Sequence, residues 1–459
     1  MDILSDLVTN FIQNFIGVLT DDPGRDFGKR MLEIQQLSNE MICKMLSSAL
    51  TAMDQDLAAQ VQQNKEWITL RTASRTLQTV FGGVSYERRY YTHKETGQNA
   101  HLLDSLIGVQ AGVRVSDDVR QKAVEEAVEK SYQSSGRNAC PGGISKTIVG
   151  RYVSHMKPAY GLQADGILRK VPNLYVEADE DHVALQDGRN VQMKLIYIHE
   201  GVDTSQKRHW LKNPHYLTWP LKGKAEDLWD HICDYIAEQY DLDCLQKVFL
   251  SGDGANWIAK GQESLPHCIP IMDGFHVSKR LIRMAGSDKE VRKKAQKLLY
   301  SGKKEGFIEL SYDLISSLPQ SKRKAKSEQV QFLLDHWQEI QNRRLPDAQG
   351  CSAEGHVSHI FSDRLSSRPL GWGEQNLVNI AQMRVMKANG QLIEYSSMKK
   401  EHIPLALPFI PNKKTFSQIK RSLKNTTQLH LISLPILTNG KTSSLYQALD
   451  SLMHLDIVS

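Results

Sequence analysis

Four acidic residues cluster in one short segment of a basic chain. In LYVEADEDHVAL, residues 174–185, Glu177, Asp179, Glu180 and Asp181 stand among apolar residues that predict a β-strand. The full chain of 459 residues nevertheless has a formal net charge of +5. A solvated turn would accommodate carboxylates more easily than a strand does, but a rigid strand is a good support for a metal ligand. We therefore expect a metal site here, and the phosphate chemistry that such a site serves.

Two acids elsewhere in the chain complete the candidate site. Asp253 follows a predicted strand in LSGDGANW and has a glycine on each side, which lets a backbone or a phosphate approach closely. Glu354 stands in the first turn of a helix predicted to begin in CSAEGHVSHIFSDRL. Ligands of open α/β sheets bind at strand ends of this kind. Alternatively, Asp253 merely caps the helix that follows it, and Glu177 and Asp181 point to solvent.

The proposed chemistry follows from the charge of these acids. Three poorly screened carboxylates at one point repel one another by several kcal/mol, so they stay ionised together only with cations between them. Oxygen ligands select hard ions, here Mg²⁺ or Mn²⁺. Two such ions about 3.5–4 Å apart can activate an attacking oxygen and stabilise the leaving oxygen in phosphodiester cleavage. We predict that Asp179, Asp253 and Glu354 hold two such ions.

A second pattern, IPIMDGFHVSKR, places Asp273 and His276 three residues apart after a short predicted strand. At the start of a helix this spacing puts both side chains on one face. His276 could then hydrogen-bond a phosphate or orient a metal-binding carboxylate. The alternative is a histidine whose hydrogen bonds are satisfied within the helix start.

Basic residues in three segments are candidate DNA contacts. RTLQTVF and VSYERRYY flank Gly82-Gly83, which predicts a β-hairpin whose second strand is basic and aromatic. Residues 116–156 predict a helix, a turn and a basic helix, the outline of a helix-turn-helix DNA reader. A solvated strand face and an ordinary helix pair are the alternatives. The candidate DNA-binding residues are Arg88, Arg89, Lys146, Arg151, Lys279 and Arg280.

Predicted strands alternate with helices after residue 173, which indicates an α/β catalytic core. The lysine-rich helices that follow look like an insertion. Their charged face either is simply solvated or contacts phosphates. The predicted regions are N-terminal helices plus a β-hairpin for oligomerisation or DNA contact (1–110), a helix-turn-helix-like DNA-binding region (111–165), the α/β core (166–283 and 351–395), a basic helical insertion (284–350) and a C-terminal tail (396–459).

The composition favours an anionic partner and no membrane span. A pI near 8.7 suits an anionic partner. No apolar run reaches the roughly 18 residues of a spanning helix, and the N-terminal apolar stripe lacks the basic segment of a signal peptide. Six cysteines without a CxxC pair indicate reduced thiols and no zinc ribbon. We therefore expect a soluble cytoplasmic protein.

Several segments resemble a known family. LYVEADEDHVAL, VFLSGDGANWI, IPIMDGFHVSK and CSAEGHVSHIFSDRLSSRPLGWGEQN are similar to the ISLre-type transposases of bacterial insertion sequences. FGGVSYERRYY also resembles the family's N-terminal region, and the resemblance covers most of the chain, most strongly 170–395. These proteins belong with the DDE transposases, which implies a ribonuclease-H-like core. The Asp-x-x-His motif and the helical insertion before the glutamate are similar to the Mutator-like and hAT arrangement.

The resemblance implies a role for each candidate residue. It makes Asp179 the first catalytic acid, Asp253 the second and Glu354 the third, with Asp273 and His276 as an accessory motif. Asp181 stays open as an alternative first acid, because it shares the strand face of Asp179 by the period of two.

The resemblance also implies cut-and-move chemistry on double-stranded DNA. The enzyme would cleave at the terminal inverted repeats of its element, and the freed 3′-hydroxyl would attack target DNA without a covalent protein–DNA intermediate. Such enzymes work as dimers or larger assemblies, so we expect a homo-oligomer. A non-catalytic, domesticated DNA-binding protein is the alternative function. A glycoside hydrolase with paired carboxylates is disfavoured, because aromatic residues make up only 7% of the chain.

Overall fold

The computed structural model describes residues 3–21, 24–158, 160–205, 207, 209–367 and 371–395. These form two compact units. One contains the described residues up to Glu126, Ser131–Val149 and Tyr395, and the other contains Ala127–Lys130 and Gly150–Glu394. The C-terminal tail predicted at 396–459 lies outside the described residues. Within them, no helix combines the length and the apolar character needed to cross a membrane.

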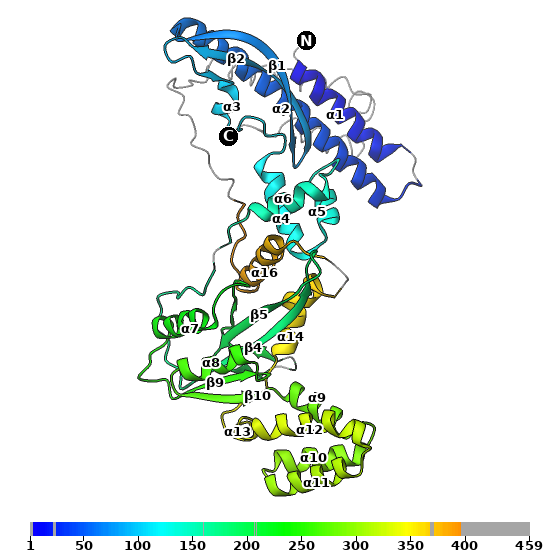
Figure 1. The fold of residues 1–459 in the computed structure, drawn as a ribbon. Coiled ribbons are helices and arrows are strands. Elements are labelled where there is room, and N and C mark those ends of the chain that lie inside the picture. Colours follow the sequence, from blue (N-terminus) through cyan, green and yellow to red (C-terminus); the bar gives the residue numbers. More distant parts are fainter. Residues whose placement is uncertain are drawn as a thin grey trace. The chain divides into compact units, whose positions relative to one another are not determined.

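The first unit packs helices against an antiparallel sheet (Figure 1). Its elements are α1 (Ile3–Thr20), α2 (Phe27–Asn64), β1 (Trp67–Thr79), β2 (Gly82–His93), β3 (Asn99–Ala100) and α3 (Leu102–Leu106). Leu57 and Val61 of α2 pack against buried residues of the sheet, among them Leu77 and Val84. β1 and β2 form the predicted hairpin, but its turn is Val80-Phe81 and not the Gly-Gly pair, because Gly82 and Gly83 of β2 already pair with Thr79 and Gln78 of β1. Gly82 has a φ of +133°, which side-chain-bearing residues rarely adopt.

Three short helices follow, α4 (Asp117–Glu129), α5 (Tyr132–Ala139) and α6 (Lys146–His155). Ser131 caps α5 by accepting a hydrogen bond from the Ser134 backbone N–H. Gly136 of α5 lies so close to the Ile144 carbonyl that a Cβ would overlap it. The chain can therefore turn tightly between α5 and α6 only because residue 136 is glycine.

The second unit contains a five-stranded mixed sheet in the order β10–β9–β4–β5–β8 (Figure 1). The strands are β4 (Asn173–Ala184), β5 (Asn190–His199), β8 (His215–Thr218), β9 (Lys247–Gly252) and β10 (Cys268–Met272). β4 pairs antiparallel with β5, and β5 with β8, whereas β4–β9 and β9–β10 are parallel pairs. A small ribbon of β6 (Val202–Asp203) and β7 (Trp210–Leu211) follows β5.

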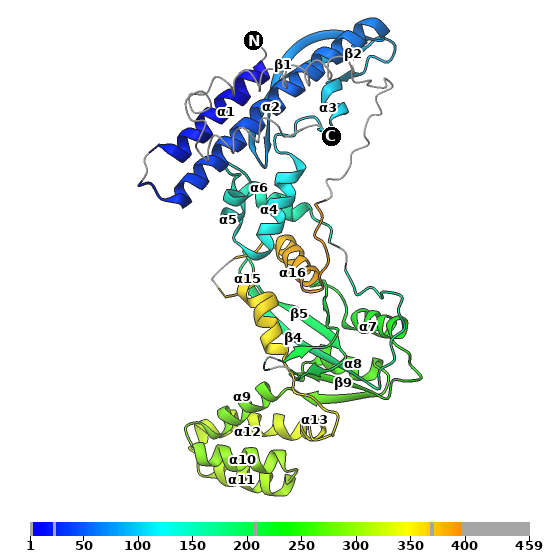
Figure 2. The ribbon, with the colours of Figure 1, turned by 180° about the vertical axis from the view of Figure 1, so that it is seen from behind.

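Helices cover both faces of this sheet, as the two opposite views show (Figures 1 and 2). Leu174, Val176 and Ala178 of β4 share a buried core with α7 (Ala225–Gln239) and α8 (Asn256–Ser264). Strand residues alternate between faces, so the odd-numbered positions of β4 face the opposite side. There β4 contacts α14 (Ala353–Val357). One face of β4 therefore builds the core, and the other is available for the acids.

A bundle of five helices interrupts the sheet unit after β10. It consists of α9 (Gly274–Ala285), α10 (Lys289–Tyr300), α11 (Lys304–Ser316), α12 (Gln320–Asp335) and α13 (Trp337–Asn342). Val277 and Leu281 of α9 share its apolar core with Phe307 and Leu333. The bundle thus begins at Gly274 rather than at the predicted residue 284, because the apolar face of α9 packs on the other helices.

After the bundle the chain returns to the sheet as a helical segment. It consists of α14, the π-helical turn η1 (Ser358–Ser362) and α15 (Asp363–Leu365), and α16 (Glu374–Ala388) follows. Arg384 of α16 holds this segment in place, because it donates hydrogen bonds to the carbonyl oxygens of Ile360 and His359. Glu354 is thereby placed on a short helix that is anchored behind it.

Candidate metal centre

The parallel strand pairs bring three aspartates to one edge of the sheet. Glu177 of β4 pairs with Ser251 of β9, so Asp179 and Asp253 each lie two residues beyond that pair. Gly252 of β9 pairs with Met272 of β10, and Asp253 and Asp273 are the next residues on their strands. Strand register therefore brings Asp253 and Asp273, which lie about 75 and 95 positions after Asp179 in the sequence, to the same end of the sheet as Asp179.

Glu354 and His276 reach the same place from helices. One carboxylate oxygen of Asp179, one of Glu354 and a ring nitrogen of His276 all lie within 4.8 Å of one another. Asp253 is not part of such a group within the described residues, and its carboxylate accepts a hydrogen bond of 2.8 Å from the Ala255 backbone N–H. The closest set of potential ligands is therefore two carboxylates and an imidazole.

The electrostatics of Asp179 fit a cation site. Burial, together with the charges of Asp253, Glu354 and Asp273, raises the pKa of Asp179 from its ordinary value of 3.8 to about 7. Crowded like charges of this kind are relieved by a cation, and carboxylate oxygens suit Mg²⁺ or Mn²⁺, whereas an imidazole nitrogen is a more usual ligand of Zn²⁺ or Fe²⁺. The carboxylates present therefore fit the predicted ions, and His276 is a nitrogen ligand that was not expected among the oxygens.

The pKa of Asp179 has a consequence for stability. In metal-free protein, Asp179 of the folded chain stays protonated up to about pH 7, whereas Asp179 of the unfolded chain loses its proton near pH 3.8. The free energy of unfolding should therefore fall as the pH rises between these two values. Because a cation would take the place of that proton, Mg²⁺ should raise the melting temperature more at pH 8 than at pH 5. Thermal unfolding with Mg²⁺ and with EDTA measures this effect. An equal Mg²⁺ shift in wild type and Asp179→Asn would contradict the ligand assignment.

The neighbouring acids of the same strand have separate roles. Asp181 accepts a hydrogen bond of 2.9 Å from the Ser366 hydroxyl, and burial raises its pKa. Glu180 faces the opposite side, where it accepts a hydrogen bond of 2.8 Å from Trp257 Nε1. Asp179, and not Asp181, is the residue that lies with His276 and Glu354. Of the two alternatives for the first acid, only Asp179 therefore belongs to this group of potential ligands.

Glu177 is buried in a hydrogen-bond network that the sequence did not reveal. Its carboxylate accepts hydrogen bonds from Tyr197 Oη at 2.5 Å, His199 Nε2 at 3.1 Å and the Ser352 backbone N–H at 2.6 Å. Burial acts to raise the pKa of Glu177, but His199 and the other donors hold it below its ordinary value. Ser352 immediately precedes α14, so this network fixes the start of the helix that carries Glu354. The alternative in which Glu177 and Asp181 point to solvent is wrong, since both are buried.

The accessory motif divides into a capping residue and a free imidazole. Asp273 caps α9 by accepting a hydrogen bond of 3.1 Å from the Phe275 backbone N–H. His276 Nε2 is buried without a hydrogen-bond partner among the described residues. The interpretation of His276 as a satisfied histidine at a helix start therefore does not fit. An unpartnered ring nitrogen beside two carboxylates suits a ligand or a phosphate contact.

Arg343 is a site residue that sequence reasoning missed. Its guanidinium lies against Gly274, where a Cβ would overlap it, and about 5.8 Å from the Tyr300 ring. Its Nη1 is buried without a hydrogen-bond partner among the described residues, and its charge opposes the rise that burial causes in the pKa of Asp273. The only signal in the sequence was the Arg-Arg pair of QNRRLPD shortly before Glu354.

The six candidate DNA-binding residues lie in three different settings. Arg88 forms an ion pair with Asp104, and Arg89 forms one of 2.5 Å with Asp54, so both guanidinium groups are used in packing the hairpin. Contact of these two with DNA stays a prediction. Lys146 and Arg151 are exposed on α6, and Lys279 is exposed on α9. Arg280 donates a hydrogen bond of 3.1 Å to Gln329 and stacks on Phe332.

Comparison with known proteins gives a family and full-length relatives. The model of the family described as "Uncharacterised protein family (UPF0236)" matches residues 26–402. A family protein of Caldanaerobacter subterraneus subsp. tengcongensis is 31% identical and covers 98% of each chain. Another from the same organism, whose name joins eleven loci, is 31% identical and covers 100% of this chain and 98% of its own. One from Streptococcus gallolyticus is 26% identical over 90% of this chain and 93% of its own.

Proposed function

We propose that this chain, which belongs to the uncharacterised protein family UPF0236, is a transposase of a bacterial insertion sequence that cleaves and joins DNA with the help of metal ions. The observation that carries the proposal is the cluster of Asp179, Glu354 and His276 at the sheet edge, with Asp253 and Asp273 beside it. A relative whose name joins eleven loci of one genome supports a mobile element.

The ribonuclease-H-like fold is part of the same proposal. It is supported by a mixed sheet whose middle strand, β4, carries the first acid, and by the helical bundle that precedes the glutamate. The first unit, with its long helices and hairpin, would bind DNA and hold subunits together.

The side chains of the candidate metal centre would divide the work. Asp179, Asp253, Glu354 and His276 would hold Mg²⁺ or Mn²⁺, which would stabilise the attacking and leaving oxygens of a phosphodiester displacement. Arg343 is placed to donate to a non-bridging phosphate oxygen, since its Nη1 has no other partner within the described residues. The Glu177 network keeps α14 in position while charge develops at the site.

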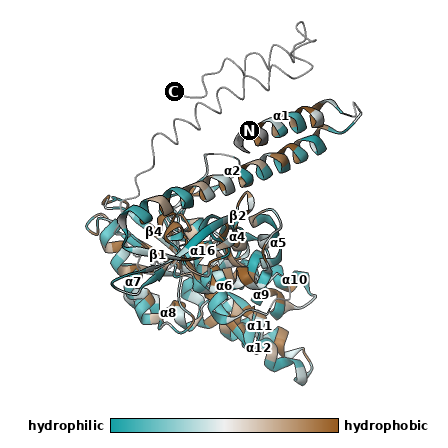
Figure 3. Ribbon diagram, turned by 90° about the horizontal axis from the view of Figure 1, so that it is seen from above, coloured by the Kyte–Doolittle hydropathy of each residue, from teal (hydrophilic) through white to brown (hydrophobic). Residues whose placement is uncertain are grey.

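We also propose a homo-oligomer that works on paired DNA ends. The support comes from α1 and α2, where hydrophobic residues recur along both helices (Figure 3). Phe27 at the start of α2 is 68% exposed, which is unusual for so large an apolar side chain. A second copy of the first unit would bury such residues.

The proposal is tested by nicking of an end-labelled duplex copied from the DNA on either side of the coding sequence. We expect cleavage with Mg²⁺ or Mn²⁺ that leaves free 3′-hydroxyls and no protein attached to DNA, and no cleavage in EDTA. DNA binding without cleavage in either metal would instead support the non-catalytic DNA-binding protein. Absence of both binding and cleavage would overturn the proposal.

A further inference from the structure

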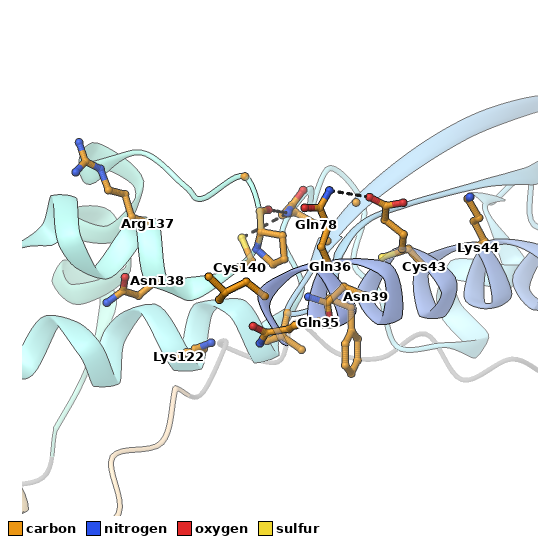
Figure 4. Close-up of a pocket in the computed structure, with 18 residues that line it drawn as sticks. Gln35, Gln36, Asn39, Cys43, Lys44, Gln78, Lys122, Arg137, Asn138 and Cys140 are labelled. Atoms are coloured by element: carbon orange, nitrogen blue, oxygen red, sulfur yellow. Dashed lines mark hydrogen bonds between the residues drawn. The ribbon is translucent and has the colours of Figure 1, made fainter. Parts of the chain in front are cut away.

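A cleft of about 1090 Å³ opens in the first unit, a different unit from the one that holds the metal centre. Its walls come from α2, from the turn between β1 and β2, from α4, and from the end of α5 with the loop that follows (Figure 4). Small-molecule pockets are mostly apolar, with a few polar groups. This cleft has amides and cations beside apolar residues such as Val80 and Phe81, so it suits an extended ligand that carries both charge and flat apolar rings.

One wall is a face of α2 that carries amide side chains. Gln35 and Gln36 lie four and three residues before Asn39, so each shares a helix face with it, and all three line the cleft in the close-up (Figure 4). Gln36 donates a hydrogen bond of 3.0 Å to Glu40, whereas Gln35 and Asn39 have no such bond within the described part of the chain. Asparagine and glutamine side chains on a helix can pair with base edges, above all with adenine.

Three cations stand around the amides. Lys44, Lys122 and Arg137 come from α2, α4 and α5, and all three are exposed. None of them forms an ion pair with any residue that the structure describes, and the acid of the cleft, Glu40, is already bonded to Gln36. Unpaired cations at the rim of a cleft attract phosphates and fix the path of a nucleic-acid backbone.

The floor of the cleft is preformed and leaves room for a strand. Gln78 donates hydrogen bonds to the Pro141 carbonyl at 2.7 Å and to Cys140 Sγ at 3.4 Å, which ties the hairpin to the loop after α5. Gly82 and Gly142 have positive φ angles and carry no side chain into the space. Phe81 also lines the cleft and is 38% exposed, so its ring is available for stacking on a base.

We infer that this cleft binds a DNA strand, with the phosphates on Lys44, Lys122 and Arg137 and the bases toward Gln35, Asn39 and Phe81. The inference rests on the proposed function, because it supplies the DNA contact that a transposase needs outside its metal centre. The cleft lies in the regions expected from sequence to contact DNA, but its cations are not among the six candidate DNA-binding residues, of which Arg88 and Arg89 are used in ion pairs within the hairpin.

The test is the salt dependence of DNA binding by the full-length protein. Fluorescence anisotropy with labelled duplex and single-stranded DNA copied from the flanks of the coding sequence gives the slope of log K against log salt. Each lost phosphate contact should reduce that slope by about 0.9 on duplex DNA and about 0.7 on single strands. Lys44→Ala/Lys122→Ala/Arg137→Ala should therefore flatten the duplex slope by about 2.7. The control Lys29→Ala/Gln55→Ala changes exposed residues of α2 outside the cleft and should leave the slope unchanged.

Two further variants test the contacts with the bases. Gln35→Ala/Asn39→Ala should keep the salt slope but lose about tenfold of the preference for flank DNA over scrambled DNA, and Phe81→Ala should weaken single-strand binding about tenfold. If these variants keep the wild-type salt slope, sequence preference and melting temperature, the cleft does not bind DNA. Metal-dependent cleavage by wild type would in that case still support the proposed function. Wild-type protein that neither binds nor cleaves DNA would overturn both.

Discussion

Replacing Asp253 by asparagine is expected to abolish metal-dependent DNA cleavage while leaving DNA binding intact. A metal ion contributes several kcal/mol of charge stabilisation in the transition state, so losing one charged ligand should slow cleavage by about a thousandfold or more. Asparagine can still accept the hydrogen bond from the Ala255 N–H in the turn before α8, so the local fold should survive. Cleavage rates and DNA affinity of the purified variant, side by side with wild type, measure the two effects.

This substitution separates the two interpretations of Asp253. If the residue only caps the following helix, Asp253→Asn should cleave like wild type, and that result would remove Asp253 from the metal centre. Glu354→Gln makes the same comparison for the third acid and should lose cleavage to a similar extent. Asp243→Ala, an exposed aspartate in the segment before β9, is the matched control and should cleave normally.

Replacing Glu177 by alanine is expected to lower the free energy of unfolding of the second unit by about 3–5 kcal/mol, because each buried donor that loses its acceptor costs about 1–3 kcal/mol. The change would leave Tyr197 Oη, His199 and the Ser352 N–H without their buried acceptor. Urea unfolding followed by tryptophan fluorescence measures it. Six of the seven tryptophans lie in the second unit, so the signal reports mainly on that unit.

Glu180→Ala in the same strand is the matched control. Glu180 accepts hydrogen bonds from Trp257 and Gln192 on the partly exposed opposite face, so its loss should cost only about 1 kcal/mol. Glu177→Gln keeps the volume and one acceptor oxygen and should fall between the two. A Glu177→Ala protein as stable as Glu180→Ala would show that the network does not hold α14 in place.

Short-range features of the chain were predictable because they depend on neighbouring residues only. Alternation along LYVEADEDHVAL predicts a strand and puts Asp179 and Asp181 on one face and Glu180 on the other, as observed. Gly82-Gly83 predicts a hairpin, which is observed, but the turn itself is Val80-Phe81 and both glycines belong to β2. The lysine-rich helices of the insertion were likewise predicted, although not where the bundle begins, because only packing shows that α9 belongs to it.

The membership of the site depended on contacts between distant segments. Strand register brings Asp253 and Asp273 to the edge near Asp179, but the helix positions decide that His276 forms a group of potential ligands with Asp179 and Glu354. The network of Glu177 joins residues up to 175 positions apart, and the ion pairs of Arg88 and Arg89 occupy side chains that composition alone suggests are free. The sequence by itself determined which residue types were available and which strand face each occupied, because these follow from local periodicity. Only the tertiary structure decided which of them share a buried, poorly screened space, because that depends on how the sheet, the bundle and α14 pack.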